Sequence, residues 1–198
     1  MPRKKTARKG RRGSRRYFCY LEQNLGIGSG LGKHFYPVID DFDGELLYYP
    51  EIVPVTIDFG RALADTTSDP RRLFDFSPRQ FEELVAEIWR KFGYCVELTS
   101  PTRDGGRDII AIKQAEVNLR VLIECKRYAT SNRVGVQVVR SLLGVKTDEK
   151  ATKAILATTS RFTAGAKDLF GRHIWELEPR DFDGVVDWLK LAVSTKSL

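Results

Sequence analysis

The stretch SPRQFEELVAEIWRKFGYCVELTSPTRDGGRDIIAIKQAEVNLRVLIECK, residues 77–126, decides the fold. It opens with Ser77, Pro78 and Gln80, which are typical of a helix N-cap, a first-turn proline and a capping-box partner. Apolar side chains then recur at helical spacing, and Gly93 supplies a left-handed stop. The pattern predicts an amphipathic helix that begins after Ser77 and ends before Gly93.

Short segments rich in β-branched residues follow this helix, and apolar and helical segments alternate after them. Strands are expected at residues 94–99, 108–112, 119–126, 154–159 and 174–177. Further helices are expected at residues 134–145, 163–170 and 182–193. This order predicts an α/β fold in which a mixed central sheet is flanked by helices on both faces.

Charged side chains cluster where two of these strands begin or end. Glu124 and Lys126 are two residues apart at the end of one strand, so their side chains share a face. Asp108 begins the preceding strand, and an antiparallel hairpin can bring it opposite Glu124. Two carboxylates suffice for Mg²⁺ or Mn²⁺ when water and a phosphate fill the other positions. Asp108 and Glu124 are therefore candidate metal ligands for phosphodiester hydrolysis.

The role of Lys126 stays open at this point. It could orient or help deprotonate an attacking water, or stabilise the charge on the pentacovalent phosphate. Taken alone, Glu124 and Lys126 also fit an ordinary exposed ion pair at a strand end, which contributes little to stability.

The wider context of these residues resembles a known family. The segments FEELVAEIWRKFGYCVEL, TRDGGRDIIAI, LIECKRY, VGVQVVRSLLGV and ILATTSRFTAGAKDLF occur in that order within residues 76–170. Together they resemble the Mrr-type restriction endonuclease domain of the PD-(D/E)xK nuclease superfamily. The resemblance implies a restriction-endonuclease-like fold, double-stranded DNA as substrate and metal-dependent cleavage. Asp108 matches the aspartate after the double glycine, and Glu124 and Lys126 match the Glu/Gln-x-Lys motif.

Two further positions follow from the resemblance. The family has a glutamate on its first helix, and Glu82 is the expected match because it borders the apolar stripe. Glu83 is expected on the polar side, facing Glu87 and Arg90. Gln137 lies where relatives often carry a helper polar residue. Many relatives have glutamine where this chain has Glu124, and a carboxylate is the stronger metal ligand.

The basic charge of the chain lies in its first residues. Residues 1–16 hold nine Lys or Arg and no acid, so the remaining 24 basic and 26 acidic residues leave a net charge of −2 against +7 for the whole chain. We expect residues 1–16 to be a disordered arm that contacts nucleic-acid phosphates, residues 17–75 to be an extension without a readable pattern, and residues 76–198 to be the endonuclease domain.

Other classes of protein fit the sequence poorly. No apolar run is long enough to span a bilayer and no signal-peptide hydrophobic region is present, so a cytoplasmic location is expected. Three scattered cysteines and two histidines do not form a zinc motif. Thr158, Thr159 and Ser160 form a hydroxyl cluster at a strand end, for which turn capping is favoured over phosphate binding.

Three functions remain in competition. The leading hypothesis is a metal-dependent DNA endonuclease of the restriction, defence or repair type. A structure-selective nuclease, such as a junction resolvase, would use the same site and would require a homodimer. A catalytically silent nucleic-acid-binding module would use the basic arm alone, although convergence of Asp108, Glu124 and Lys126 argues against it.

Overall fold

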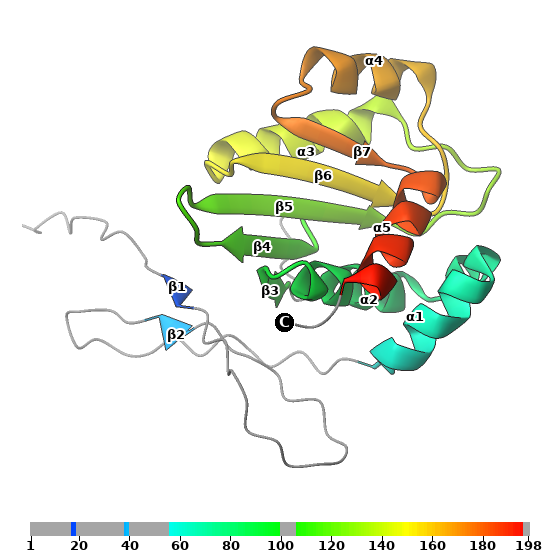
Figure 1. Ribbon diagram of the computed structural model, residues 1–198. Helices are drawn as coiled ribbons and strands as arrows, with labels where there is room; N and C mark the ends of the chain where they lie inside the picture. The colour runs from blue at the N-terminus through cyan, green and yellow to red at the C-terminus, as the bar shows by residue number, and fades with distance from the viewer. Residues whose placement is uncertain (1–16, 19–37, 40–55, 100–105, 196–198) are drawn as a thin grey trace, which may run out of the picture. The chain divides into compact units, whose positions relative to one another are not determined.

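The computed structural model describes residues 17–18, 38–39, 56–99 and 106–195 (Figure 1). The chain divides into two compact units, residues 1–51 and 52–198. In the first unit, β1 (Tyr17–Phe18) pairs antiparallel with β2 (Val38–Ile39). The basic arm expected at residues 1–16 lies outside the described residues, and the second unit carries the sheet predicted above.

The second unit is built on a five-stranded mixed sheet. The first three strands in the sheet order pair antiparallel, and the last two pairings are parallel. In that order the strands are β3 (Cys95–Leu98), β4 (Ile109–Lys113), β5 (Leu119–Lys126), β6 (Lys153–Thr158) and β7 (Leu177–Arg180). The predicted α/β architecture with a mixed sheet is confirmed.

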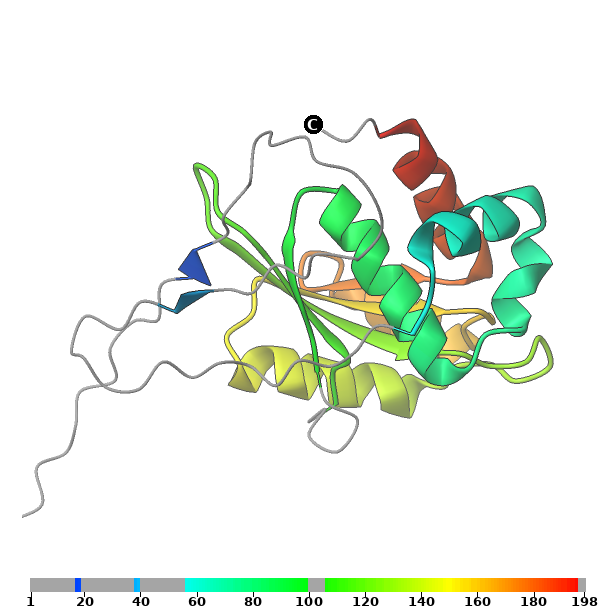
Figure 2. The same cartoon turned by 90° about the horizontal axis from the view of Figure 1, so that it is seen from below.

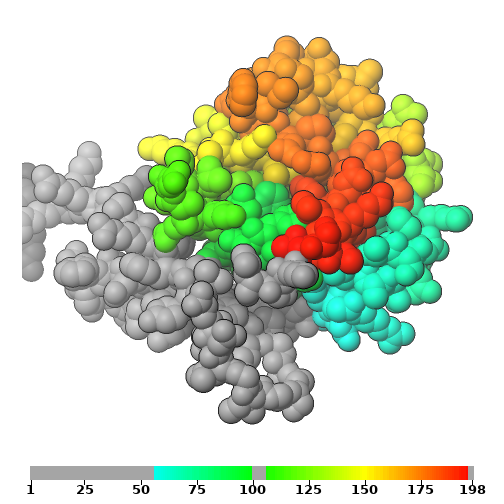
Figure 3. Space-filling model, viewed as in Figure 1, coloured from blue at the N-terminus to red at the C-terminus, as the bar shows by residue number. Residues whose placement is uncertain are grey.

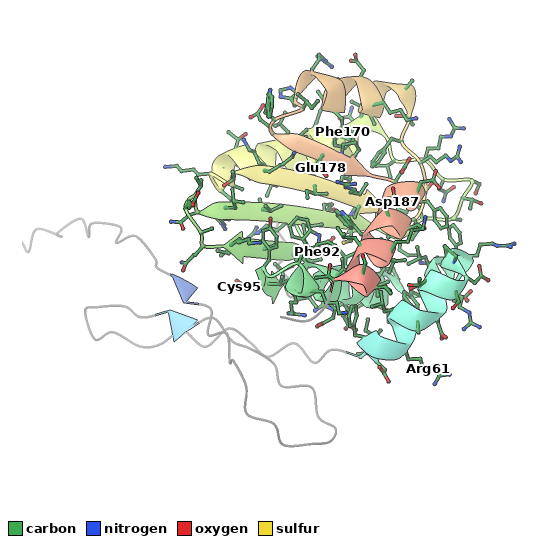
Figure 4. The ribbon with its side chains drawn as sticks, in the orientation of Figure 1. Arg61, Phe92, Cys95, Phe170, Glu178 and Asp187 are labelled. Atoms are coloured by element: carbon green, nitrogen blue, oxygen red, sulfur yellow. The ribbon has the colours of Figure 1, made fainter. Side chains whose placement is uncertain are left out.

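Helices cover both faces of this sheet, as Figure 2 shows with the sheet seen nearly edge-on. One face packs against α2 (Pro78–Lys91) and α5 (Phe182–Ser194), and α1 (Phe59–Ser68) packs against these two helices. The other face packs against α3 (Val136–Asp148) and α4 (Ala164–Arg172). Phe170 of α4 lies over this second face (Figure 4), where its ring meets that of Phe162 at 5.1 Å.

Strand β5 is the centre of the sheet and alternates between the two faces. Val121, Ile123 and Cys125 belong to the core under α2 and α5, whereas Leu122 belongs to the core under α3 and α4. Glu124 and Lys126 continue the Leu122 side of the strand. Burial on both faces holds the backbone of β5 firmly at the point where these charged side chains project.

Helix α2 forms as its local sequence predicts. The Ser77 side chain accepts from the Gln80 N–H, and the Gln80 side chain accepts from the Ser77 N–H, which completes the capping box. Gly93 follows the helix with φ +81°, the left-handed conformation that ends it. The ring of Trp89 packs edge-on against Trp188 at 5.7 Å and thereby joins α2 to α5.

The structure corrects the expected position of one strand. Residues 174–177 were predicted to be extended, but β7 begins at Leu177, and Ile174 and Trp175 lie in the preceding turn with exposed side chains. The apolar run therefore reflects a turn rather than a strand. Pro179 is tolerated in β7 because β7 is an edge strand of the sheet.

Residues 56–75, which show no readable pattern in the sequence, are ordered parts of the second unit. Helix α1 is capped by Asp58, whose side chain accepts from the Arg61 N–H, and η1 (Pro70–Phe74) follows. Phe74 stacks on Phe182 with ring centroids 5.4 Å apart. Helices α1 and α5 lie side by side, in cyan and red in Figure 3. None of the described helices is long and apolar enough to cross a membrane.

Candidate active site

The strand register brings Asp108 opposite Glu124. Ile109 pairs with Ile123 in the β4–β5 hairpin, and the Asp108 N–H donates to the Ile123 carbonyl at 3.0 Å. Asp108 Oδ2 accepts from the Cys125 N–H at 2.6 Å. The start of β4 and the ends of β5 and β6 lie at the same end of the sheet, where these strands begin or finish (Figure 1). The hairpin predicted from sequence therefore places the two carboxylates next to each other.

Lys126 completes the group through an ion pair from its Nζ to Glu124 Oε1. Burial disfavours the ammonium, but the hydrogen bond and charge of Glu124 outweigh it and raise the pKa of Lys126. Lys126 is thus a cation at neutral pH. Its side chain is partly exposed, so the ammonium can face a bound anion.

The two carboxylates are strongly buried. Asp108 is 8% exposed and Glu124 is 7% exposed. Burial, followed by the charge of Glu124, raises the pKa of Asp108 to about 7, although the Cys125 N–H opposes the change. Two desolvated carboxyl groups side by side are unfavourable in the absence of a cation, which is the electrostatic situation that a bound metal ion relieves.

A buried carboxylate oxygen of Glu124 is in a position to accept a metal ion. Glu124 Oε2 is buried and has no hydrogen-bond partner among the described residues. Within the same residues no set of three or more His, Cys, Asp or Glu side chains is close enough to enclose a metal. Two carboxylates without a full protein cage match the way Mg²⁺ is commonly held, with water and substrate phosphate completing its coordination.

Glu82 lies near this group on α2. Its Oε2 accepts from Arg79 Nη1 at 2.8 Å, and Arg79 Nη1 also donates to the Thr99 carbonyl at 3.0 Å. Burial raises the pKa of Glu82; Arg79 and Lys126 oppose this change, and Glu124 adds to it. These charges show that Glu82 is within electrostatic reach of Lys126 and Glu124. Arg79 was missed from sequence, although its spacing from Glu82 is that of a helical ion pair.

The neighbouring Glu83 was placed wrongly by the helical pattern. It was expected on the polar side of α2, but it is 1% exposed. Its Oε2 accepts from the Thr56 N–H at 2.8 Å, the Thr56 hydroxyl at 2.9 Å and the Ile57 N–H at 3.2 Å. The segment entering α1 covers this side of α2, and it supplies the hydrogen bonds that a buried carboxylate requires.

Gln137 is not joined to the group. It lies in the first turn of α3 with an exposed side chain, and no described hydrogen bond links it to Asp108, Glu124 or Lys126. The structure thus brings together Asp108, Glu124, Lys126 and Glu82, whereas no described hydrogen bond or ion pair joins Gln137 to them.

The hydroxyl cluster after β6 has a structural use. Thr158 Oγ1 donates to the Lys126 carbonyl at 2.6 Å. Thr159 Oγ1 donates to the Tyr128 carbonyl at 2.7 Å and accepts from the Tyr128 N–H at 2.9 Å, and Ser160 Oγ donates to the Asn132 carbonyl. These bonds fix the chain that leaves β5 immediately after Lys126, as the favoured turn-capping interpretation predicts.

Comparisons with known proteins agree with this geometry. A family model described as restriction endonuclease, of the Mrr catalytic type, matches residues 73–189. An uncharacterised protein, y4cE from Sinorhizobium fredii, is 31% identical over 125 residues, 59% of this chain and 32% of the relative. The type IV methyl-directed restriction enzyme EcoKMrr of Escherichia coli is 28% identical over 116 residues, 54% of this chain and 37% of the enzyme. The chain thus spans about a third of the length of the curated relatives it matches.

A solved structure has the same architecture. The DNA modification-dependent restriction endonuclease AspBHI superimposes with a TM-score of 0.52 at 20% identity, over 79% of this chain and 44% of that chain. At this level of identity the likeness concerns the fold, and it agrees with the predicted restriction-endonuclease-like sheet.

Proposed function

The chain belongs to the Mrr-type restriction endonuclease family, and on that premise we propose that it is a divalent-metal-dependent DNA endonuclease of the restriction, defence or repair type. The observation that carries the proposal is the group formed by Asp108, Glu124 and Lys126 at one end of the central strands. Its substrate would be double-stranded DNA in the cytoplasm. Relatives named as restriction enzymes, including one named methyl-directed, support this substrate class.

Asp108 and Glu124 would hold Mg²⁺ or Mn²⁺, and the free Glu124 Oε2 is an atom ready to do so. When bound, the metal ion supplies Lewis-acid stabilisation of a phosphoryl oxygen and lowers the pKa of a water. The Cys125 N–H holds the Asp108 carboxylate in place, and the packed β5 backbone does the same for Glu124. Little reorganisation of these groups is then required during the reaction.

Lys126 would stabilise negative charge on the phosphate. It is paired with Glu124 in the metal-free protein, and competition from a metal ion for that carboxylate would leave the ammonium facing the substrate. A cation with a raised pKa is better suited to this electrostatic role than to removing a proton from water. Glu82 would act as an accessory carboxylate that orients a water near the site, with Arg79 fixing its position.

Cleavage of supercoiled plasmid tests the proposal. Methylated and unmethylated plasmids would each be treated with the wild type, Lys126→Ala and Lys190→Ala, with Mg²⁺ and with EDTA. Lys190 pairs with Asp187 at the exposed surface of α5 and is the matched control. We expect nicking that requires Mg²⁺, falls at least roughly 100-fold in Lys126→Ala and is unchanged in Lys190→Ala.

The same assay can refute the assignment. Cleavage that persists in EDTA, or that Lys126→Ala leaves intact, would exclude this site as the catalytic centre. Binding of DNA by a wild type that cleaves neither plasmid would instead favour a catalytically silent binding module.

A further inference from the structure

A basic pocket of about 490 Å³ opens beyond the end of β6, outside the group described above. Its polar lining includes Arg71, Arg133 and Arg161 together with Thr130. Its apolar wall is the stacked pair of Phe74 and Phe182, whose rings are parallel to within 5°. The volume lies in the range of pockets that hold small organic ligands.

The charges of the pocket favour an anion. Its lining includes three arginines and no acidic residue. Arg71 has an exposed partner, Asp69, at 3.6 Å. Arg133 and Arg161 make no ion pair with any residue that the structure describes. Three guanidinium groups around one cavity are a suitable arrangement for the paired hydrogen bonds that bind phosphate.

The floor of the pocket is rigid and already satisfied. Thr159 and Ser160 form it, and their hydroxyls are used by the backbone at Tyr128 and Asn132. These hydroxyls are therefore not available to bind a ligand, and the arginines and Thr130 are the residues left to bind one. The aromatic wall distinguishes the pocket from a simple phosphate site, because a phosphate alone gains nothing from two phenyl rings, whereas a base or deoxyribose does.

The pocket is placed close to the candidate active site. Strand β6 lies beside β5, with Thr158 paired with Lys126, and the Thr159 N–H donates to the Lys126 carbonyl at 3.3 Å. The residues that form this floor therefore directly follow the strand position that is paired with Lys126.

We propose that this pocket is a subsite for one unpaired nucleotide of the bound DNA strand, with the phosphate on the arginines and the base or sugar against Phe74 and Phe182. The inference rests on the proposed nuclease function and deepens it. A paired base is stacked within the duplex and does not offer its face to protein rings, so the nucleotide that fits is displaced from the duplex or single-stranded.

Binding without cleavage tests the subsite. Fluorescence anisotropy in EDTA would compare a fully paired duplex with the same duplex carrying one extra unpaired nucleotide. The variant is Arg133→Gln/Arg161→Gln, which changes only exposed side chains. The control is Arg172→Gln/Lys190→Gln, which removes the same charge from exposed positions on α4 and α5. We expect the wild type to prefer the unpaired nucleotide, and the pocket variant to lose roughly 10-fold or more on that DNA but under about 3-fold on the paired duplex.

A second readout reports the aromatic wall. 2-Aminopurine at the unpaired position should be quenched by stacking when the wild type binds, and Phe74→Leu should abolish the quenching while the arginine contacts remain. Equal losses on both DNAs, or a loss matched by the control variant, would overturn the proposal. Displacement of the DNA by free deoxynucleoside monophosphate at low concentration would also overturn it, because the ligand would then be a free nucleotide.

The binding experiment on the subsite and the cleavage experiment on the nuclease can fail independently of each other. If plasmid is cleaved but the pocket variant shows no selective loss, the subsite is wrong and the nuclease stands. If no plasmid is cleaved but the selective loss is found, the pocket binds an unpaired nucleotide in a protein that is not a nuclease.

Discussion

Replacing Asp108 with asparagine should make the metal-free protein more stable at pH 8. Burial and the charge of Glu124 raise the pKa of Asp108 from its ordinary 3.8 to about 7. The folded state therefore binds this proton more tightly than the unfolded chain does. The stability associated with it is fully present below about pH 4 and is lost as the pH rises through about 7.

The size of the effect follows from the two pKa values. A difference of about three between the folded and unfolded pKa corresponds to about 4 kcal/mol lost by the wild type above pH 7. Asparagine keeps a carbonyl oxygen to accept the Cys125 N–H, now at 2.6 Å from Asp108 Oδ2, and carries no charge beside Glu124. We expect Asp108→Asn to gain on the order of 2 to 4 kcal/mol at pH 8, and progressively less toward pH 4.

Urea unfolding in EDTA at pH 5, 6, 7 and 8 would measure this difference, with the buried Trp89 and Trp188 as fluorescent reporters. Asp187→Asn on the exposed surface is the matched control and should track the wild type. Mg²⁺ should stabilise the wild type at pH 8 and leave Asp108→Asn nearly unchanged. A variant that is less stable than the wild type at pH 8, or a difference that does not vary with pH, would refute the reasoning.

Other substitutions test separate features. Glu82→Gln should lower plasmid cleavage by roughly 10-fold and spare DNA binding, and a variant with full activity would remove Glu82 from the site. Gln137→Ala should cleave at the wild-type rate, since its side chain is exposed and makes no described hydrogen bond to the carboxylates; a loss near that of Lys126→Ala would contradict this. Deleting residues 1–16 should weaken DNA binding and flatten its dependence on salt, and an unchanged slope in a salt titration would exclude the arm as a phosphate contact. Thr159→Val should cost about 1 to 3 kcal/mol in urea unfolding because it breaks both hydrogen bonds to Tyr128, whereas Thr147→Val on exposed α3 should cost less.

The features predicted correctly from sequence depend on short-range patterns. The capping box of α2 involves residues three positions apart, and the approach of Asp108 to Glu124 follows from one hairpin whose register is set by alternating burial. Glu83 was misplaced because its hydrogen-bond donors come from Thr56 and Ile57. These residues are far from Glu83 in the sequence, and a helical period does not reveal that they cover α2.

Helix α1 and the start of β7 were not predicted correctly from the sequence for a different reason. The buried side of α1 consists of Ala62, Leu63 and Thr66, of which only Leu63 is large and apolar, and Thr66 is accommodated by donating to the Ala62 carbonyl at 2.6 Å. Ile174 and Trp175 are apolar yet exposed, so hydrophobicity alone suggested a strand where the chain turns. Both errors arise because side-chain type does not determine what tertiary structure will cover it.

The contact between Glu83 and the segment at Thr56 determines how the domain can be transplanted. The family match begins at residue 73, and a fusion protein cut there would keep Glu83 but lose all three of its donors. Arg79 Nε would remain 3.7 Å from Glu83 Oε1, but the cut would also remove the buried Ala62 and Leu63 of α1 and expose the surfaces of α2 and α5 that α1 covers. A portable version of this module therefore has to begin upstream of Thr56, even though the residues of the candidate active site all come later.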